Sequence, residues 1–251
     1  MDLAPEIYAV LTMVAFLAGF IDAIAGGGGL LTVPAMLAAG IPPIATLATN
    51  KLQSSFSSGT AMLNFGRKGM IDWRTYWPQI IVILILSGMG SWAVQSIETD
   101  MLNLIVPVLL LAVVAYVLLS PRMSDEDVHH RLSARGYLPV GGAIGFYDGF
   151  FGPGTGSFFA TSLVSLRGLG LTRATAHTKA FNFASNFGSL IVFLANGHAM
   201  ILLGLCMAAG SAAGAWTGSH TAMRFGARVI RPLLITICLA LTARLLWQAL
   251  R

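Results

Sequence analysis

Charge is scarce in this sequence. Its 251 residues include 15 lysine and arginine residues and 10 aspartate and glutamate residues, together only 10% of the chain. These charges gather in short segments, and the apolar runs between them are long enough to cross the roughly 30 Å hydrocarbon core of a bilayer. With 56% hydrophobic residues and a mean hydropathy of +0.77, the chain is predicted to be an all-α polytopic membrane protein. A soluble enzyme, a DNA-binding domain and a disordered tail are excluded.

Cysteine and metal-binding patterns are rare as well. Cys206 and Cys238 lie in separate apolar stretches without metal-ligand spacing, so we predict that both are free and buried. We interpret the adjacent His129 and His130 as part of a solvated turn rather than as a metal site. No basic segment precedes the first apolar run, so no cleavable signal peptide is expected. We expect no metal, no cofactor and no nucleic-acid partner, because loop lysines and arginines explain the net charge of +5.

The apolar runs define ten predicted segments. They are approximately 7–25, 30–40, 44–65, 77–97, 101–119, 137–151, 156–168, 173–195, 198–218 and 229–248. Segments 30–40 and 156–168 are too short to span a bilayer, since at 1.5 Å per residue they cover only about 16 to 20 Å. Each follows a glycine cluster, so we predict short broken or re-entrant helices at these two places.

The two halves of the chain are similar in sequence. The tetrapeptide GFID that ends at Asp22 returns 126 residues later as GFYD, which ends at Asp148. The tripeptide TNK that ends at Lys51 returns as HTK, which ends at Lys179. Glycines and a Gly-x-Trp motif also match in the same order, which favours an internal duplication over chance.

Loop charge indicates that the halves have opposite orientations. The loop after the third segment carries Arg67, Lys68 and Arg74, whereas its counterpart 196–198 has no lysine or arginine. The other loop pairs reverse in the same way. Because lysine and arginine accumulate on the cytoplasmic side, two inverted-topology repeats of about five segments each are predicted, with both termini outside the cytoplasm. The predicted division is a first transmembrane repeat over 1–119, a cytoplasmic linker loop over 120–136 and a second, inverted repeat over 137–251.

Inverted repeats with paired, glycine-interrupted segments are how secondary transporters place a substrate site near the bilayer midplane. The N-terminus of each short helix supplies backbone N–H groups and a positive dipole end, which suits an anion. The glycines predicted to contact the substrate are Gly26, Gly27, Gly28, Gly29, Gly152, Gly154 and Gly156. The alternative is that these glycines only allow close helix crossings.

Two of the chain's three lysines, Lys51 and Lys179, are a matched pair inside apolar segments. A charge at bilayer depth costs about 2.5 to 3.5 kcal/mol, so it normally faces a cavity or a partner. We predict that both lysines neutralise a small oxyanion by charge-assisted hydrogen bonds. The alternative is that each extends to the membrane interface. The polar neighbours predicted to hydrogen-bond the substrate are Asn50, Gln53, Ser54 and Asn182.

Asp22 and Asp148 are the matching acids beside the glycine clusters. Either is a candidate counter-ion to a lysine or a proton carrier, and either would also serve as a helix-end cap. His177 departs from the matched position Thr49 and is a third coupling candidate, because histidine titrates near neutral pH. A polar helix-end role for His177 is the competing interpretation.

These motifs resemble those of the sulfite exporter TauE/SafE family, also called the TSUP transporters. GFIDAIAGGGGLLTVPAML and ATNKLQSSFSSGTAMLNF resemble its first-half signature, and GFYDGFFGPGTGSFF and AHTKAFNFASNFGSL resemble its second-half signature. The resemblance implies a multi-pass transporter of the bacterial inner membrane that moves sulfite, sulfonates or related organosulfur and carboxylate anions, often outward. It also implies a substrate region at Asp22, Gly26 to Gly29, Asn50, Lys51, Asp148, Gly152, Gly154, Gly156 and Lys179. Two departures, Thr178 in place of Asn50 and Pro153 within the second glycine cluster, imply that the two sides of the site are not equivalent.

The sequence therefore predicts a secondary transporter of small anions, and not an enzyme, that works by alternating access around a midplane site. An anion channel is one alternative. A cation-carrying or proton-coupled transporter centred on Asp22 and Asp148 is another. The expected partners are a small anionic substrate, the lipid bilayer and a second copy of the chain in a homodimer.

Overall fold

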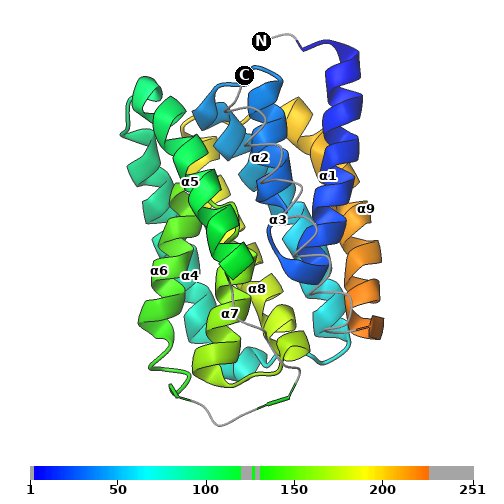
Figure 1. Ribbon diagram of the computed structural model, residues 1–251, viewed down its shortest axis with the longest axis vertical. Coiled ribbons are helices and arrows are strands. Elements are labelled where there is room, and N and C mark those ends of the chain that lie inside the picture. Colours follow the sequence, from blue (N-terminus) through cyan, green and yellow to red (C-terminus); the bar gives the residue numbers. More distant parts are fainter. Residues whose placement is uncertain (1–2, 120–125, 128–130, 226–251) are drawn as a thin grey trace.

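The computed structural model describes residues 3–119, 126–127 and 131–225, and in these residues it contains nine α-helices and no strand. Figure 1 shows them as a bundle with the N-terminus at its upper end. The helices are α1 (Pro5–Ala25), α2 (Gly29–Ala38), α3 (Pro43–Arg67), α4 (Trp73–Gln95), α5 (Thr99–Leu119), α6 (Leu138–Phe150), α7 (Thr155–Arg167), α8 (Leu171–Ala195) and α9 (Ile201–Phe225). The tenth predicted segment, Cys238, His129 and His130 lie outside the described residues.

The all-α prediction is confirmed for the described residues, and the first nine predicted segments each correspond to one helix. By length and composition, α1, α4 and α9 are apolar enough to cross a membrane. Helices α3 and α8 have 25 residues each, so they are long enough to span, but their sequences carry a polar face. Together these helices fit a polytopic membrane protein.

Two short helices follow the glycine clusters, as predicted. Helix α2 has 10 residues and α7 has 13, so they extend only about 15 to 20 Å. Each forms a hairpin with the helix before it, and the labels in Figure 1 place α1 and α2 in the upper part of the bundle and α6 and α7 in the lower part. The two hairpin tips meet: a Cβ added at Gly26 would lie 2.7 Å from the carbonyl carbon of Gly156.

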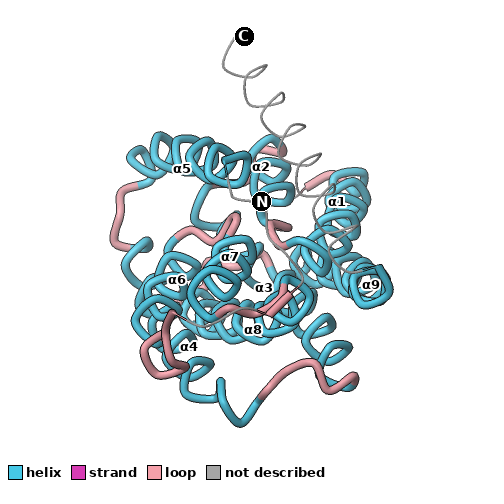
Figure 2. Tube along the Cα trace, turned by 60° about the horizontal axis from the view of Figure 1, so that its bottom comes forward, coloured by secondary structure: helices cyan, strands magenta, loops and turns pink. Residues whose placement is uncertain are grey.

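Helices α3 and α8 pack against each other at the centre of the bundle, and Figure 2 shows α1, α4, α5 and α9 around them. The outer pairs α1 with α9 and α4 with α6 are in close contact because glycines let their backbones approach. Gly214 of α9 lies against Phe16 and Phe20 of α1. Gly90 of α4 lies in the same way against Phe146 and Phe150 of α6.

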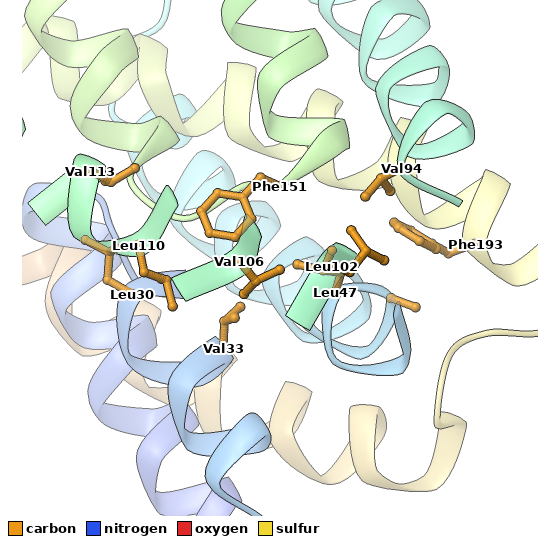
Figure 3. Close-up of a cluster of buried hydrophobic side chains, with 11 residues drawn as sticks. Leu30, Val33, Leu47, Val94, Leu102, Val106, Leu110, Val113, Phe151 and Phe193 are labelled. Carbon is orange, nitrogen blue, oxygen red and sulfur yellow. The ribbon is translucent and has the colours of Figure 1, made fainter. Parts of the chain in front are cut away.

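Helix α5 covers the hairpin tips with one apolar stripe. Its buried residues Leu102, Val106, Leu110 and Val113 recur every three or four positions, the spacing of one helix face. Figure 3 shows this stripe in a cluster with Leu30 and Val33 of α2, Leu47 of α3, Val94 of α4, Phe193 of α8 and Phe151 just after α6. Because the cluster joins elements from both halves, it holds the two glycine loops together.

The described part of the linker between α5 and α6 is bonded to the end of α7, the start of α8 and the turn between them. The Asp127 carboxylate accepts a hydrogen bond from the Gly170 N–H (2.6 Å) and pairs with Arg173. The Leu132 N–H donates to the Leu166 carbonyl (2.9 Å). The linker boundaries stay a prediction, although α5 ends at Leu119 and α6 begins at Leu138.

Candidate substrate site

Lys51 of α3 forms a buried ion pair with Asp148 of α6. Its Nζ lies 2.8 Å from Asp148 Oδ1 and also donates to the Asp148 backbone carbonyl. The side chains are only 1% and 4% exposed, so Lys51 does not extend to the membrane interface. Two hydroxyls also lie against the Asp148 carboxylate. Ser185 donates to Oδ2, and Thr155 divides its single hydrogen between Oδ1 (3.1 Å) and the Gly152 carbonyl (2.6 Å).

Lys179 of α8 faces Asp22 of α1 in the corresponding arrangement. Its Nζ donates to the Asp22 backbone carbonyl but lies 3.7 Å from Oδ2. The Gly28 N–H donates to Oδ1 at 3.2 Å. Lys179 is fully buried, whereas the Asp22 side chain is 17% exposed. In both pairs, therefore, a lysine from one half of the chain binds an aspartate from the other half.

A small cavity lies between the hairpin tips and the two central helices. Its volume is about 30 Å³, enough for about two water-sized groups. It is lined by Asp22, Gly27, Gly28, Gly29, Asn50, Ser54, Asp148, Gly152, Gly154, Thr155, Gly156, Asn182 and Asn186. The structure thus brings both aspartates, most of the predicted glycines and three of the predicted polar side chains to one place.

The N-termini of the two short helices supply hydrogen-bond donors to this cavity. The Gly29 N–H begins α2, the Gly156 N–H lies in the first turn of α7, and neither has a backbone or side-chain acceptor among the described residues. Such N–H groups and the positive end of the helix dipole bind anions. Some glycines of the two clusters line the cavity, and others allow the hairpins to cross closely. Both roles predicted for the glycine clusters are therefore present, at different residues.

Asn50 is held so that its amide nitrogen faces the glycine loop. Its Oδ1 accepts hydrogen bonds from Thr32 Oγ1 (2.6 Å) and Gln53 Nε2 (2.9 Å). Its Nδ2 lies 3.6 Å from the position that a Cβ would take at Gly29. Asn182 lies beside Gly156, and its buried Oδ1 has no partner among the described residues. The cavity therefore offers amide donors and the unpaired acceptor oxygen of Asn182.

Five predicted site residues do not line the cavity. Both lysines lie behind its wall, and Lys51 Nζ is 2.7 Å from where a Cβ would stand at Gly152. Gln53 contacts Asn50 and Ser54, and Gly26 makes the hairpin crossing. The fifth residue is His177.

His177 is engaged near the start of α8. Its Nε2 accepts a hydrogen bond from the Asp72 N–H (3.1 Å), and its Nδ1 bonds with the Arg173 carbonyl (2.8 Å). Its ring packs on Tyr76, with the two ring centroids 4.6 Å apart. It therefore connects α8 with the loop between α3 and α4, which agrees with the polar helix-end interpretation.

Three residues of the site are not among the predicted substrate contacts. Thr155 and Ser185 hydrogen-bond Asp148, and Asn186 lines the cavity. Asn186 lies seven residues after Lys179 on the polar face of α8, so the helical period was a signal for it. Thr155 and Ser185 had no such signal, because their role depends on where the two hairpins meet.

The comparisons with known proteins cover nearly the whole chain. The family model "Sulfite exporter TauE/SafE" matches residues 11–245. A "Probable membrane transporter protein ORF9" of Sinorhizobium sp is 47% identical over 98% of this chain and 94% of its own length. A "Probable membrane transporter protein" of Haemophilus influenzae is 42% identical over 99% and 98% of the two chains. The "Probable membrane transporter protein YfcA" of Escherichia coli K12 is 40% identical over 98% and 92%. No solved structure matches the chain.

Proposed function

The chain belongs to the sulfite exporter TauE/SafE family, and from this premise we propose that it is a secondary transporter that exports small anions across the bacterial inner membrane. Its relatives carry the name of membrane transporters. In the proposed mechanism, the substrate binds in the central cavity, and one group of helices moves against the other to open that cavity to each side in turn.

The observation that carries the proposal is the meeting of two short-helix N-termini at one cavity. Gly29 is the first residue of α2 and Gly156 is the second residue of α7, and the two helices reach the cavity from different hairpins. Their free N–H groups supply positive potential without a full charge, and Lys51 and Lys179 lie just behind the wall. An oxyanion would accept hydrogen bonds from these groups and from the Asn50 amide.

An inverted repeat is part of the proposal and is supported by matched packing. Phe20 and Phe146 are 126 residues apart, as are Asp22 and Asp148. Phe20 contacts Gly214, while Phe146 contacts Gly90. Each half thus uses the same motif against the other half, which is what a pseudo-two-fold axis between them would produce.

The proposed orientation follows the loop charge. In Figure 1 the ends of α3 and α9 and the start of α4 lie at the lower end of the bundle, opposite the N-terminus. Their flanking basic residues are Arg67, Lys68, Arg74 and Arg224. We assign this end to the cytoplasm by the positive-inside rule. A homodimer is proposed as the assembly of this multi-pass protein.

The proposed substrates are sulfite, sulfonates and related organosulfur or carboxylate anions. The cavity of about 30 Å³ holds only about two water-sized groups, so in the proposed mechanism it widens to admit these anions of four or more heavy atoms. The oxygens of a sulfite, sulfonate or carboxylate group would accept hydrogen bonds from the Gly29 and Gly156 N–H groups, which have no partner among the described residues. Because the cavity is lined by small and polar residues, we expect little affinity for long apolar anions.

The first test is anion binding by the purified protein. A thermal-shift screen against sulfite, sulfate, thiosulfate, sulfonates and short carboxylates should reveal at least one ligand that raises the melting temperature. Lys51→Ala and Lys179→Ala should each lose that shift. Lys68→Ala is the matched control, because Lys68 is exposed in a loop and is expected to bind as the wild type does. Unchanged binding in both buried-lysine variants would contradict the proposed site.

The second test is flux in proteoliposomes. A transporter should show saturable uptake of the bound anion, and its rate should depend on a driving gradient. Flux near the diffusion rate, without saturation, would instead favour a channel. The exposed-loop variant Lys68→Ala again serves as the control for correct insertion.

A further inference from the structure

We propose that Asp22, and not its repeat counterpart Asp148, binds a proton that accompanies each transported anion. This inference rests on the proposed function and adds the coupling ion and its position. It starts from a difference between the two ion pairs, which occupy matched positions in the sequence but have different surroundings in the structure.

Both oxygens of the Asp148 carboxylate have a donor. Lys51 Nζ lies 2.8 Å from Oδ1 and Ser185 donates to Oδ2, while Thr155 divides its single hydroxyl hydrogen between Oδ1 (3.1 Å) and the Gly152 carbonyl (2.6 Å). The side chain is only 4% exposed. Protonation would require at least one of these donors to give up its acceptor in a buried place, which is costly.

The Asp22 carboxylate is held much more weakly. Its partners are the Gly28 N–H at 3.2 Å and Lys179 Nζ at 3.7 Å, and the second distance is too long for a hydrogen bond. Oδ2 therefore has no hydrogen-bond donor among the described residues. The side chain is 17% exposed and lines the cavity, so its carboxylate can be reached from the cavity.

The sequence explains this difference residue by residue. Thr155, which donates to Asp148, has Gly29 at the matched position 126 residues earlier, so no hydroxyl is available there. Ser185, the other hydroxyl donor, has Ser57 at the matched position 128 residues earlier. Ser57 is buried, but its Oγ has no hydrogen-bond partner among the described residues. The two hydroxyls that contact the Asp148 carboxylate thus have no equivalent contacts at the Asp22 carboxylate.

Charge balance gives the proton its role. Asp22 and Asp148 carry two negative charges, and Lys51 and Lys179 carry two positive ones, so the site is neutral when it is empty. An anion entering this site would bring an uncompensated charge into the interior, which is unfavourable. A proton taken up by Asp22 neutralises its carboxylate and leaves Lys179 free to pair with a singly charged anion, so the loaded site is neutral again.

No other described titratable group faces Asp22 closely enough to take this role. Lys179 comes from α8, and Lys51 with Asp148 lies across the cavity. Helix α2 contains no titratable residue. The remaining titratable groups on α3, α7, α8 and α9 are Arg67, Arg167, Arg173, His177, Cys206, His220 and Arg224, none of which lines the cavity.

The experiment measures protons taken up when an anion binds. Purified wild-type protein in weakly buffered, sodium-free solution receives methanesulfonate, and a pH indicator dye records the change. This probe is chosen because it carries one negative charge that does not change with pH in the range used, which sulfite does not guarantee. We expect about one proton per bound anion and, wherever that proton is taken up, an affinity that falls about tenfold for each unit of increasing pH. Anion binding with no proton uptake, or binding that requires sodium, would overturn the inference.

The variants assign the proton to one carboxyl. Asp22→Asn mimics the protonated form, so it should bind the anion without proton uptake and with no pH dependence. Asp100→Asn makes the same chemical change at an exposed position and should behave as the wild type does. If Asp22→Asn is not recovered as folded protein, Asp22→Glu should retain proton uptake but shift its pH midpoint. The assignment would be overturned if Asp22→Asn still took up one proton per bound anion, or if the pH midpoint of proton uptake were unchanged in Asp22→Glu.

These outcomes are separate from failure of the proposed function. If the wild-type protein binds none of the anions screened, the anion site itself is wrong, and proton uptake has no anion to accompany. If it binds an anion without a proton, the transporter assignment stands and only the role of Asp22 is lost.

Discussion

Gly26 and Gly156 meet backbone to backbone where the tips of the two helical hairpins cross. A Cβ at Gly26 would lie 2.7 Å from the Gly156 carbonyl carbon, and a Cβ at Gly156 would lie 2.7 Å from Gly26 Cα. Neither neighbour is a side chain that could turn away. The crossing therefore requires glycine on both hairpins, and it brings both short-helix N-termini to one cavity.

Gly26→Ala is expected to destabilise the protein strongly, because it adds a backbone clash to an unfavourable φ of 78°. Gly40→Ala is the matched control: Gly40 has a φ of 79°, but a Cβ there would meet nothing within 4 Å. The Gly40→Ala variant should therefore be destabilised only by the unfavourable backbone conformation, by about 1 to 2 kcal/mol. The stability of both variants is measured by melting temperature and by the yield of monodisperse protein in detergent. Equal losses of stability in the two variants would contradict a tight crossing of the hairpins.

Lys51 and Asp148 should show strong energetic coupling. Lys51→Met alone leaves a buried carboxylate without its cation, and Asp148→Asn alone leaves a buried ammonium, so each is expected to cost about 3 to 5 kcal/mol. The double variant removes both charges and should cost less than the sum of the two. Denaturant unfolding in detergent provides the three free energies. Additive losses would contradict a direct ion pair.

Asn50→Asp should weaken anion binding while preserving the local structure. The carboxylate can still accept the bonds from Thr32 and Gln53, but it replaces the amide donor beside Gly29 with negative charge. We expect a loss of about tenfold or more in affinity, since a hydrogen bond to a charged group contributes about 1.5 to 3 kcal/mol. Isothermal titration with the anion found in the screen measures it. Asn103→Asp, at an exposed position of α5, controls for the added charge.

Asp72 caps the N-terminus of α4 outside the membrane-spanning segments. Hydrogen bonds from the hydroxyl and the backbone N–H of Thr75 hold the pKa of its carboxyl below the ordinary value of 3.8. Because the folded-state pKa is the lower one, the charged cap stabilises the fold above about pH 3.8 and loses this effect as the pH falls through the folded-state pKa.

Asp72→Ala should therefore lower stability by about 1 kcal/mol at neutral pH, the usual loss of an N-cap, and by less in acid. Melting temperatures of the wild type and the variant across this pH range measure the difference. Asp72→Asn keeps a capping oxygen without a charge, so its stability relative to Asp72→Ala should not depend on pH. A wild-type advantage that grows in acid would contradict the capping role.

Much of the fold was predictable because it depends on local hydrophobicity. The first nine segments were predicted to within four residues at each end, except that α9 continues to Phe225, seven residues past the predicted end, since charged and glycine-rich breaks separate the apolar runs. The shortness of α2 and α7 followed from counting residues after the glycine clusters. Lys51 and Lys179 were conspicuous because a buried charge needs a partner.

The sequence by itself determined that the chain is a helical membrane protein with two matched sets of polar residues in its interior. It could not determine which aspartate pairs with which lysine, because both acids have the same spacing to their glycine clusters and only the crossing of the hairpins brings Asp148 to Lys51. Nor could it place the lysines behind the cavity wall or reveal that Ser185 and Thr155 enclose one carboxylate while the other is left open. These properties depend on distances between residues far apart in the chain, so the tertiary structure alone decided them.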